Sequence, residues 1–315
     1  MRPLTRRSIL AALAGLLTPF RSTTGQVCQS RPLPASPLLK GFQEAEECYA
    51  VGLKHKVFRI GKGPAVFLCH ELPGLYEDDI ELARRIAARG FSVWLPLFFG
   101  SPGDHDFLRF AVSLCLNPRS EFTCWLPRTS PAAHWVEPLL NTAHSSCGGK
   151  GVGVIGMCLT GSFALAAMSS PALCAAILCQ PTQPFLGKSK LDLSPGDLDS
   201  AKASTVEILA LKFSADPKSP DARWRTLRNI FQSRLTELVI DSSSGNHARV
   251  SHGAHSVLGD SYNDQPGTPT REAFERVIRF LDNRLSEVPS TPEFPRIGET
   301  CPPGFAVYGT ATCPA

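Results

Sequence analysis

Cys158 stands at the apex of a short, glycine-flanked segment that suits a nucleophile. An apolar run, 152–155, precedes the hexapeptide 156–161 (GMCLTG), and a helical apolar pattern over 162–168 follows it. This order predicts a strand, a tight turn and a helix, with small residues leaving room beside the apex. The N-terminus of such a helix favours thiolate over thiol. Cys158 is therefore a candidate catalytic nucleophile, although buried cysteines also serve packing alone.

A histidine and an acid that can activate this sulfur follow it along the chain. Asp216 lies on the loop after a strand predicted over 206–213, where an acid can orient a histidine. His255 lies in the last loop before the closing helix, within 253–258 (GAHSVL). His252 is the alternative base, and helix capping is the alternative role of Asp216. We assign the base to His255 and the orienting acid to Asp216.

A second loop, 70–75 (HELPGL), follows the strand predicted over 65–69. Its position suits one backbone amide of an oxyanion hole, and the residue after the nucleophile, Leu159, suits the other. Glu71 in this loop is costly as a buried charge unless it is paired or used. The loop is therefore expected at the same site as Cys158.

The elements that must position these residues alternate between strands and helices. Two neighbouring strands, 56–60 and 65–69, are expected on either side of a turn. The other expected strands are 91–96, 175–179, 206–213 and 237–240, and the other expected helices are 78–89, 135–145, 222–232 and 270–285. Such alternation predicts an α/β protein with a doubly wound, mostly parallel sheet and helices on both faces. The stretch 97–130 breaks the pattern and predicts a long excursion over the ligand-binding end of the sheet.

Four segments in this order resemble the dienelactone hydrolase family of α/β hydrolases. They are 69–75, 156–161, 215–216 and 254–258. The resemblance extends over roughly 57–285 and implies the α/β-hydrolase fold. The cysteine turn combined with the His-Glu loop is the specific feature.

The resemblance also implies roles for individual residues. Cys158, His255 and Asp216 would form a Cys-His-Asp triad. Glu71 would contact the thiol in the resting enzyme and help to control its ionisation. The implied oxyanion donors are the backbone amides of Leu72 and Leu159.

The chain departs from the family at two places. Members that act on dienelactone carry an arginine shortly after the catalytic histidine, where this chain has Gly259 and Asp260 and no arginine before Arg271. Thr160 also replaces the usual glycine of the turn. The catalytic residues therefore transfer from the family more securely than the substrate does.

The predicted function is hydrolysis of a small ester or lactone through a thioester. His255 accepts the Cys158 proton, the thiolate attacks the carbonyl, and water cleaves the acyl-enzyme. The mechanism needs no cofactor, and the cysteine spacing suits no zinc site. The alternative is a catalytically silent binding protein on the same scaffold. The complete set of nucleophile, base and acid favours the enzyme.

The first 25 residues are expected to form an export signal. Residues 5–10 (TRRSIL) resemble a twin-arginine motif, and the apolar stretch 9–17 is too short to span a bilayer. A periplasmic or extracellular location follows, with a cytoplasmic or organellar one as the alternative. The four arginines of 1–25 account for the whole net charge of +4. The neutral remainder argues against a nucleic-acid partner, and we expect no membrane span in the mature form.

The rest of the chain is expected to divide into an N-terminal extension (26–54), a hydrolase domain (55–286) and a C-terminal tail (287–315). Eleven cysteines fit an oxidising compartment. Two disulfides are expected, Cys301–Cys313 first and Cys115–Cys124 next. The cysteines expected to stay reduced are Cys69, Cys158, Cys174 and Cys179.

Overall fold

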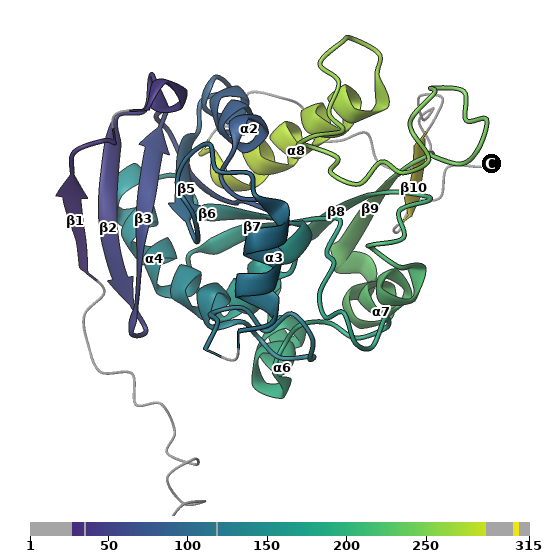
Figure 1. Ribbon diagram of the computed structural model, residues 1–315, viewed down its shortest axis with the longest axis horizontal. Coiled ribbons are helices and arrows are strands. Elements are labelled where there is room, and N and C mark those ends of the chain that lie inside the picture. Colours follow the sequence, from purple (N-terminus) through teal and green to yellow (C-terminus); the bar gives the residue numbers. More distant parts are fainter. Residues whose placement is uncertain (1–26, 35, 118, 288–304, 309–315) are drawn as a thin grey trace, which may run out of the picture.

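The computed structural model describes residues 27–34, 36–117, 119–287 and 305–308. In these residues a ten-stranded sheet runs in the order β1-β2-β3-β5-β4-β6-β7-β8-β9-β10 (Figure 1). The strands are β1 (Val27–Arg31), β2 (Glu44–Ala50), β3 (Leu53–Ile60), β4 (Ala65–Cys69), β5 (Ser92–Leu97), β6 (Val152–Met157), β7 (Leu173–Cys179), β8 (Ile208–Phe213), β9 (Leu235–Ile240) and β10 (Phe305–Tyr308). Read along this order, the six strands from β5 through β4 to β9 run parallel to one another. The pairs that involve β1, β2, β3 or β10 are antiparallel.

Helices cover both faces of this sheet. They are α2 (Glu77–Ala87), α3 (Phe107–Cys115), α4 (Pro131–Cys147), α5 (Phe163–Ala166), α6 (Pro195–Ala203), α7 (Asp221–Phe231) and α8 (Pro269–Leu285). Side chains of α2 and α8 share one apolar core, and side chains of α4 to α7 share another on the opposite face. Figure 1 shows these two layers above and below the strands. The doubly wound α/β architecture expected from the sequence is confirmed.

The central strands are buried along their whole length. Every residue of β4, β6 and β8 is shielded from solvent. Strands covered on both faces need continuous apolar runs rather than alternation, which is the pattern that made them recognisable in the sequence. Their carboxyl ends lie at one edge, where the loops that follow them meet.

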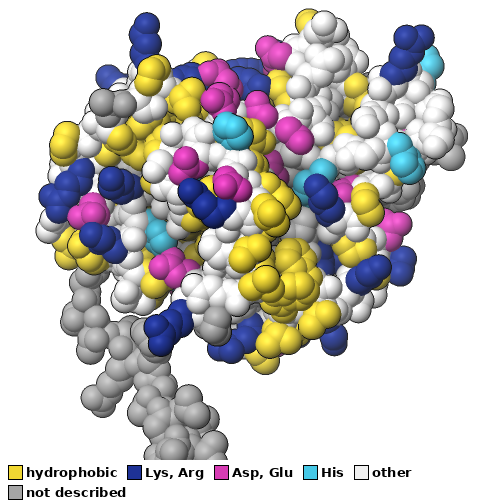
Figure 2. All heavy atoms as spheres, viewed as in Figure 1, with side chains coloured by type: hydrophobic (Ala, Val, Ile, Leu, Met, Phe, Trp, Pro, Cys, Tyr) yellow, Lys and Arg dark blue, Asp and Glu magenta, His cyan; other side chains and the backbone are white. Residues whose placement is uncertain are grey.

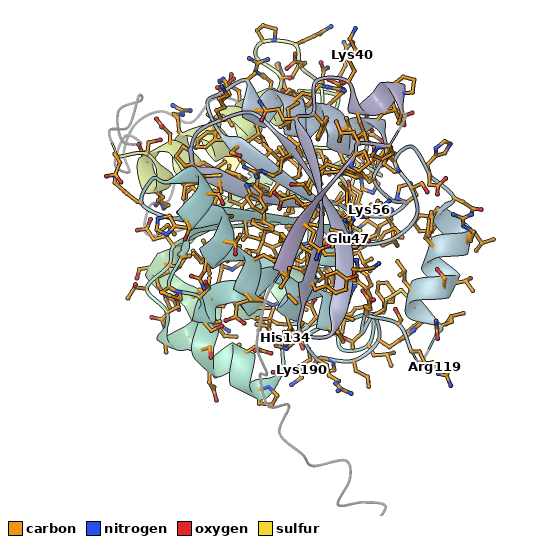
Figure 3. All side chains as sticks on the ribbon, turned by 90° about the vertical axis from the view of Figure 1, so that its left-hand side faces the viewer. Lys40, Glu47, Lys56, Arg119, His134 and Lys190 are labelled. Atoms are coloured by element: carbon orange, nitrogen blue, oxygen red, sulfur yellow. A yellow bond between two sulfur atoms is a disulfide. The ribbon has the colours of Figure 1, made fainter. Side chains whose placement is uncertain are left out.

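One expected strand pairing is wrong. β3 and β4 are not neighbours, because β5 lies between them. The chain crosses from β4 through α2 and returns as β5 parallel to β4. β3 therefore pairs antiparallel with the outer edge of β5, with Lys56 opposite Leu97. Figure 3 views this edge of the sheet, with Glu47 marking β2 and Lys56 marking β3.

Several elements were not expected from the sequence. The excursion over 97–130 contains helix α3, capped by Asp106, whose side chain accepts a hydrogen bond from the Arg109 amide at 3.0 Å. Helix α6 and the edge strands β1, β2 and β10 were also missed. β2 carries glutamates among its few apolar residues, so it lacks the apolar run of a central strand.

Two disulfides join described cysteines. Cys115–Cys124 is confirmed, and Cys28–Cys48 was not expected. Cys28 and Cys48 are opposite each other in the β1–β2 ladder, a proximity that only the strand register creates. All four cysteines expected to be reduced are free, as is Cys147. Cys301 and Cys313 lie outside the described residues, as does the expected signal over 1–25.

Helices in the described part of the chain are all too short or too polar to cross a bilayer. Two disulfides are compatible with an oxidising compartment. Export of the protein stays a prediction.

Candidate functional site

The turn that carries Cys158 depends on its glycines. Cys158 has a φ of +49°, an unusual backbone conformation for a residue with a side chain. A Cβ on Gly156 would lie 2.1 Å from the Thr160 carbonyl oxygen, and one on Gly161 would lie 2.5 Å from Cα of Pro181. Only glycine allows these close backbone approaches. The turn therefore presents Cys158 at the end of β6.

Thr160 stabilises the same turn. Its hydroxyl accepts a hydrogen bond from the Met157 amide at 3.0 Å and donates one to the Cys69 carbonyl at 2.9 Å. These bonds join the turn to the end of β4. The structure thus gives a local reason for threonine at a position where the family usually has glycine.

The helix after Cys158 is shorter than expected. A 3-10 turn, Cys158–Thr160, comes first, then α5 (Phe163–Ala166), then another 3-10 turn, Ala167–Ser169. Pro171 disfavours helical backbone at Ser170, which is extended, so helical structure does not continue beyond the second 3-10 turn. The helix predicted over 162–168 is present, but its α-helical part is only Phe163–Ala166. A four-residue helix also gives little dipole support to a thiolate.

His255 and Asp216 meet as the sequence predicted. Nδ1 of His255 lies 2.7 Å from Oδ2 of Asp216, and both residues are buried, with exposures of 8% and 5%. The other carboxylate oxygen of Asp216 accepts a hydrogen bond from the Lys218 amide at 3.0 Å. An ionised Asp216 requires the proton on Nδ1. Nε2 is buried and has no hydrogen-bond partner among the described residues.

The sulfur lies beside this histidine and beside Glu71. One ligand atom each from Glu71, Cys158 and His255 lie within 4.8 Å of one another. Burial opposes the charged form of the imidazole, but Asp216 and Cys158 favour it more strongly and raise the pKa of His255 to about 10. His255 is therefore expected to be protonated at neutral pH.

Glu71 belongs to a buried hydrogen-bonded cluster. Its carboxyl group accepts a hydrogen bond from the Ser256 hydroxyl, and Nε2 of Gln180 lies 3.4 Å from its other oxygen. Burial raises the pKa of Glu71 to about 7, although the Ser256 bond acts in the opposite direction. Nearby Asp79 is also fully buried, and burial raises its pKa well above the usual value. Two carboxyl groups this deep disfavour a charge on each other.

Gly259 is required by this cluster. A Cβ at this position would lie 2.5 Å from Oγ of Ser256 and 2.8 Å from Oε1 of Glu71. Gly259 thus packs directly on the Glu71 carboxyl group, near the position where dienelactone-cleaving members carry an arginine. Arg271, the next arginine, bonds Glu275 at 3.0 Å on α8 and does not line the pocket.

The three side chains open into a pocket of about 420 Å³. Glu71, Cys158 and His255 line it together with Leu72 and Thr182, whose hydroxyl lies 3.7 Å from the Cys158 sulfur. Apolar walls come from Tyr76, Phe107 and Phe185, and cationic side chains come from Lys188 and Lys218. The pocket can therefore hold a small organic molecule against the sulfur.

The other predicted residues are placed as follows. Leu72 lines the pocket, and Leu159 is buried directly after the nucleophile. Their amides as oxyanion donors stay a prediction. His252 instead has Nδ1 3.2 Å from the Ser242 carbonyl, outside the pocket lining. Asp216 does not cap α7, whose N-cap is Pro220.

Sequence reasoning missed Ser256, Gln180 and Thr182. Ser256 follows His255 directly, and a hydroxyl beside a histidine is too common to indicate a contact with Glu71. Gln180 and Thr182 come just after β7, at the same sheet edge as Cys158. That position was the available signal for them.

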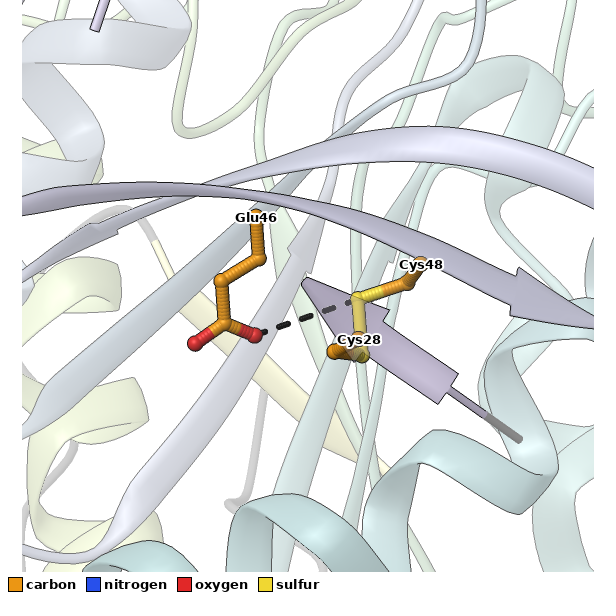
Figure 4. A group of neighbouring side chains, drawn as sticks. All are labelled: Cys28, Glu46 and Cys48. Atoms are coloured by element: carbon orange, nitrogen blue, oxygen red, sulfur yellow. Dashed lines mark hydrogen bonds between the residues drawn. A yellow bond between two sulfur atoms is a disulfide. The ribbon is translucent and has the colours of Figure 1, made fainter. Parts of the chain in front are cut away.

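Among the described residues, two groups of side chains have the composition of a metal site. Glu71, Cys158 and His255 offer oxygen, sulfur and nitrogen, which are zinc ligands, but an ion there would occupy the nucleophile. In the second group, Glu46 lies 3.9 Å from Cys48, which is bonded to Cys28 (Figure 4). Sulfurs joined in a disulfide supply no thiolate, so this second group does not suit a metal.

Comparisons with known proteins agree with the observed fold. Similar folds include a dienelactone hydrolase-like promiscuous phosphotriesterase from metagenomic libraries, 15% identical, with a TM-score of 0.55 over 84% of this chain and 100% of that one. A cold-adapted esterase from an Arctic intertidal metagenomic library is 15% identical, with a TM-score of 0.53 over the same shares. No curated protein matches the chain significantly. The sequence profile of the dienelactone hydrolase family matches residues 49–285. The chain therefore belongs to the dienelactone hydrolase family.

Proposed function

We propose that the protein is a cysteine-dependent hydrolase that cleaves small esters or lactones. One observation carries this proposal. The pair His255–Asp216, at 2.7 Å, lies beside the Cys158 sulfur at the base of a pocket large enough for a small substrate. Membership of a hydrolase family supports the same conclusion.

The proposed reaction begins with a proton held by His255. Asp216 stabilises the imidazolium, and an imidazolium stabilises an adjacent thiolate. The Cys158 thiolate attacks the carbonyl carbon, and the developing oxyanion is held by the amides of Leu72 and Leu159. His255 then protonates the leaving alcohol as the tetrahedral adduct collapses to a thioester. Water, deprotonated by His255, cleaves the thioester and restores the thiolate.

Glu71 has a separate role in this proposal. A negative carboxylate near the sulfur would oppose a thiolate, and burial keeps the carboxyl group protonated up to about pH 7. The Ser256 and Gln180 contacts hold the group in place. Glu71 is therefore a positioning residue that adjusts the charge around the nucleophile.

The chemistry favours esters and lactones over amides. The tetrahedral adduct can expel either the leaving group of the substrate or the Cys158 thiolate. An alcohol competes with the thiolate better than an amine does. The pocket joins apolar walls to the cationic side chains of Lys188, Lys218 and Arg223, and the arginine that follows the histidine in dienelactone-cleaving members is absent. We therefore expect esters with an apolar body to be accepted.

A substrate panel tests this proposal. The protein and its Cys158→Ala variant are compared on short-chain p-nitrophenyl esters, lactones and matched anilides. We expect hydrolysis of at least one ester or lactone by the parent, none above background by the variant, and slower turnover of the anilide. Preference for peptide or anilide bonds, or equal activity of the variant, would contradict the proposal. Rapid acylation of Cys158 by a thiol-directed probe further distinguishes an enzyme from a silent binding protein.

We also propose export through the twin-arginine motif over 5–10. The motif and the two disulfides support this location. Cell fractionation of the full chain and of its Arg6→Lys/Arg7→Lys variant tests it. We expect the variant to be retained in the cytoplasm, whereas an unchanged distribution would contradict the proposal.

A further inference from the structure

Large apolar side chains are concentrated on one exposed surface of the molecule. Four are on or just after α3, namely Phe107, Leu108, Val112 and Leu116. Leu108 and Leu116 are 73% and 62% exposed. Figure 2 shows hydrophobic side chains gathered over α3 and the loops below it.

Two loops continue this surface. They add Trp125, Leu126, Phe185 and Leu186. The Trp125 and Phe185 rings meet edge to face with centroids 5.3 Å apart, and the Leu186 amide bonds the Trp125 carbonyl at 3.1 Å. We call these eight residues the apolar patch. The three other large exposed hydrophobics of the described residues lie far away, on or beside β1 and β2.

The apolar patch reaches the catalytic pocket. Phe107 and Phe185 belong to the patch and also line the pocket that contains Cys158. A molecule that lies on the patch therefore has a continuous apolar path to the sulfur. Contiguous exposed apolar surface of this kind marks an interaction site.

Cationic side chains surround the patch. They are Arg119, Arg128, Lys188, Lys190 and Lys218, and none makes an ion pair with another described residue. Arg119 lies beyond the end of α3 (Figure 3). The segments 107–119 and 184–190 contain no acidic residue. Of the acids nearest these segments, Asp104 is paired with Arg109 at 3.4 Å, Asp106 caps α3, and Glu121 is paired with His55 at 2.8 Å.

We propose that the apolar patch docks on a lipid surface that bears anionic headgroups and that the pocket takes its ester substrate from that surface. Exposed leucine and aromatic side chains enter the hydrocarbon boundary, while the surrounding cations pair with phosphate groups. One leaflet of an anionic bilayer offers both the hydrocarbon boundary and the phosphate groups. The substrate part of this proposal rests on the proposed esterase function, and the docking part does not.

Vesicle sedimentation tests the docking. The intact protein is mixed with vesicles of phosphatidylcholine alone or of phosphatidylcholine with phosphatidylglycerol. We expect about tenfold or greater preference for the anionic vesicles, reduced by salt. Leu108→Ser/Leu116→Ser should lower binding by about tenfold or more, and Arg119→Gln/Arg128→Gln/Lys190→Gln should remove the anionic preference. Val27→Ser, an exposed apolar residue on β1, is the matched control and should bind like the parent.

The readouts separate docking from catalysis. None of the substituted residues lines the pocket, so turnover of water-soluble p-nitrophenyl acetate should change by less than about twofold in all these variants. Cys158→Ala should bind vesicles normally while losing turnover, so failure of the esterase function leaves the docking result readable. The Leu108→Ser/Leu116→Ser variant should hydrolyse a long-chain ester in anionic vesicles more slowly than the parent. This loss should match its loss of vesicle binding.

Three results would overturn the proposal. One is no binding to anionic vesicles. Another is binding that the Leu108→Ser/Leu116→Ser variant retains in full. The third is a dimer in solution that this variant dissociates, which would make a second copy of the chain the occupant of the patch.

Discussion

The proposed catalytic centre and the excursion over 97–130 differ in how far their side chains are buried. His255 and Asp216 are almost completely buried, and each side chain is held by a hydrogen bond. The excursion instead exposes Leu108 and Leu116, and a disulfide joins the end of α3 to the following loop. The contrast indicates that the proposed chemistry is held by buried loops, while access to it is built on the exposed excursion. Changes in one region should therefore leave the function of the other intact.

The largest effect is expected at the nucleophile. Cys158→Ala removes the atom that forms the thioester, so ester turnover should fall by about four powers of ten or more. Steady-state kinetics with p-nitrophenyl acetate measures the loss. Circular dichroism and vesicle binding should match the parent, because the variant leaves the excursion untouched. Loss of vesicle binding would show that the two regions are not independent.

A smaller loss is expected from Asp216→Asn. An amide cannot stabilise the imidazolium and disfavours the proton on Nδ1, so turnover should fall by about two to four powers of ten. The pKa of His255 should also fall, since the Asp216 hydrogen bond is among the groups that raise it. NMR titration of the imidazole measures this shift. An unchanged titration with unchanged turnover would remove Asp216 from the mechanism.

The excursion is tested by Cys115→Ser/Cys124→Ser. Removing a disulfide that closes a short loop should cost about 2–3 kcal/mol of local stability. Amide hydrogen exchange should accelerate over α3, while p-nitrophenyl acetate turnover falls by less than about tenfold. Cys28→Ser/Cys48→Ser, at the β1–β2 edge, is the control and should leave α3 protected. A rate loss as large as that of Asp216→Asn would mean that the excursion positions the catalytic residues.

The smallest effect concerns Glu71 and pH. A carboxyl group with a folded pKa of about 7 and an ordinary value of 4.5 binds an extra proton in the folded state between these pH values. Stability is therefore lost as pH rises through this window, by roughly 3–4 kcal/mol at most. Glu71→Gln should abolish this loss, so the variant should gain stability relative to the parent as pH rises from about 4.5 to about 7.

Chemical denaturation of parent and Glu71→Gln at several pH values measures the difference. His255 acts in the same direction at higher pH, because its raised pKa gives stability that is lost as pH rises from about 6.5 to about 10. Comparing parent with variant cancels this contribution. A parent-minus-variant difference that does not change with pH would contradict a buried, protonated Glu71.

The sequence predicted the contacts of the proposed catalytic residues better than their surroundings for a physical reason. The glycines around Cys158 and the apolar run of β6 are local signals, Asp216 lies just after β8, and His255 lies in the loop between β9 and α8. Each of these features depends on only a few consecutive residues, so each can be recognised in a single segment of the sequence.

The features missed depend on distant segments. The placement of β5 between β3 and β4 and the Cys28–Cys48 bond arise from register and crossover, which no single segment encodes. Helix α3 exposes Phe107, Leu108 and Val112 alongside polar residues, so it lacks the uniformly polar face that identifies an ordinary surface helix. The same property that concealed α3 in the sequence makes it the candidate docking surface.

Mass spectrometry of the trapped acyl-enzyme tests the central claim most directly. The protein is mixed with excess p-nitrophenyl acetate, quenched in acid within the first turnovers, and digested. The account predicts one acetyl group on the peptide that contains Cys158, and none on that peptide in Cys158→Ala. An unmodified Cys158 during active turnover, or an acetyl group that accumulates on Cys147 or Cys174 instead, would contradict it.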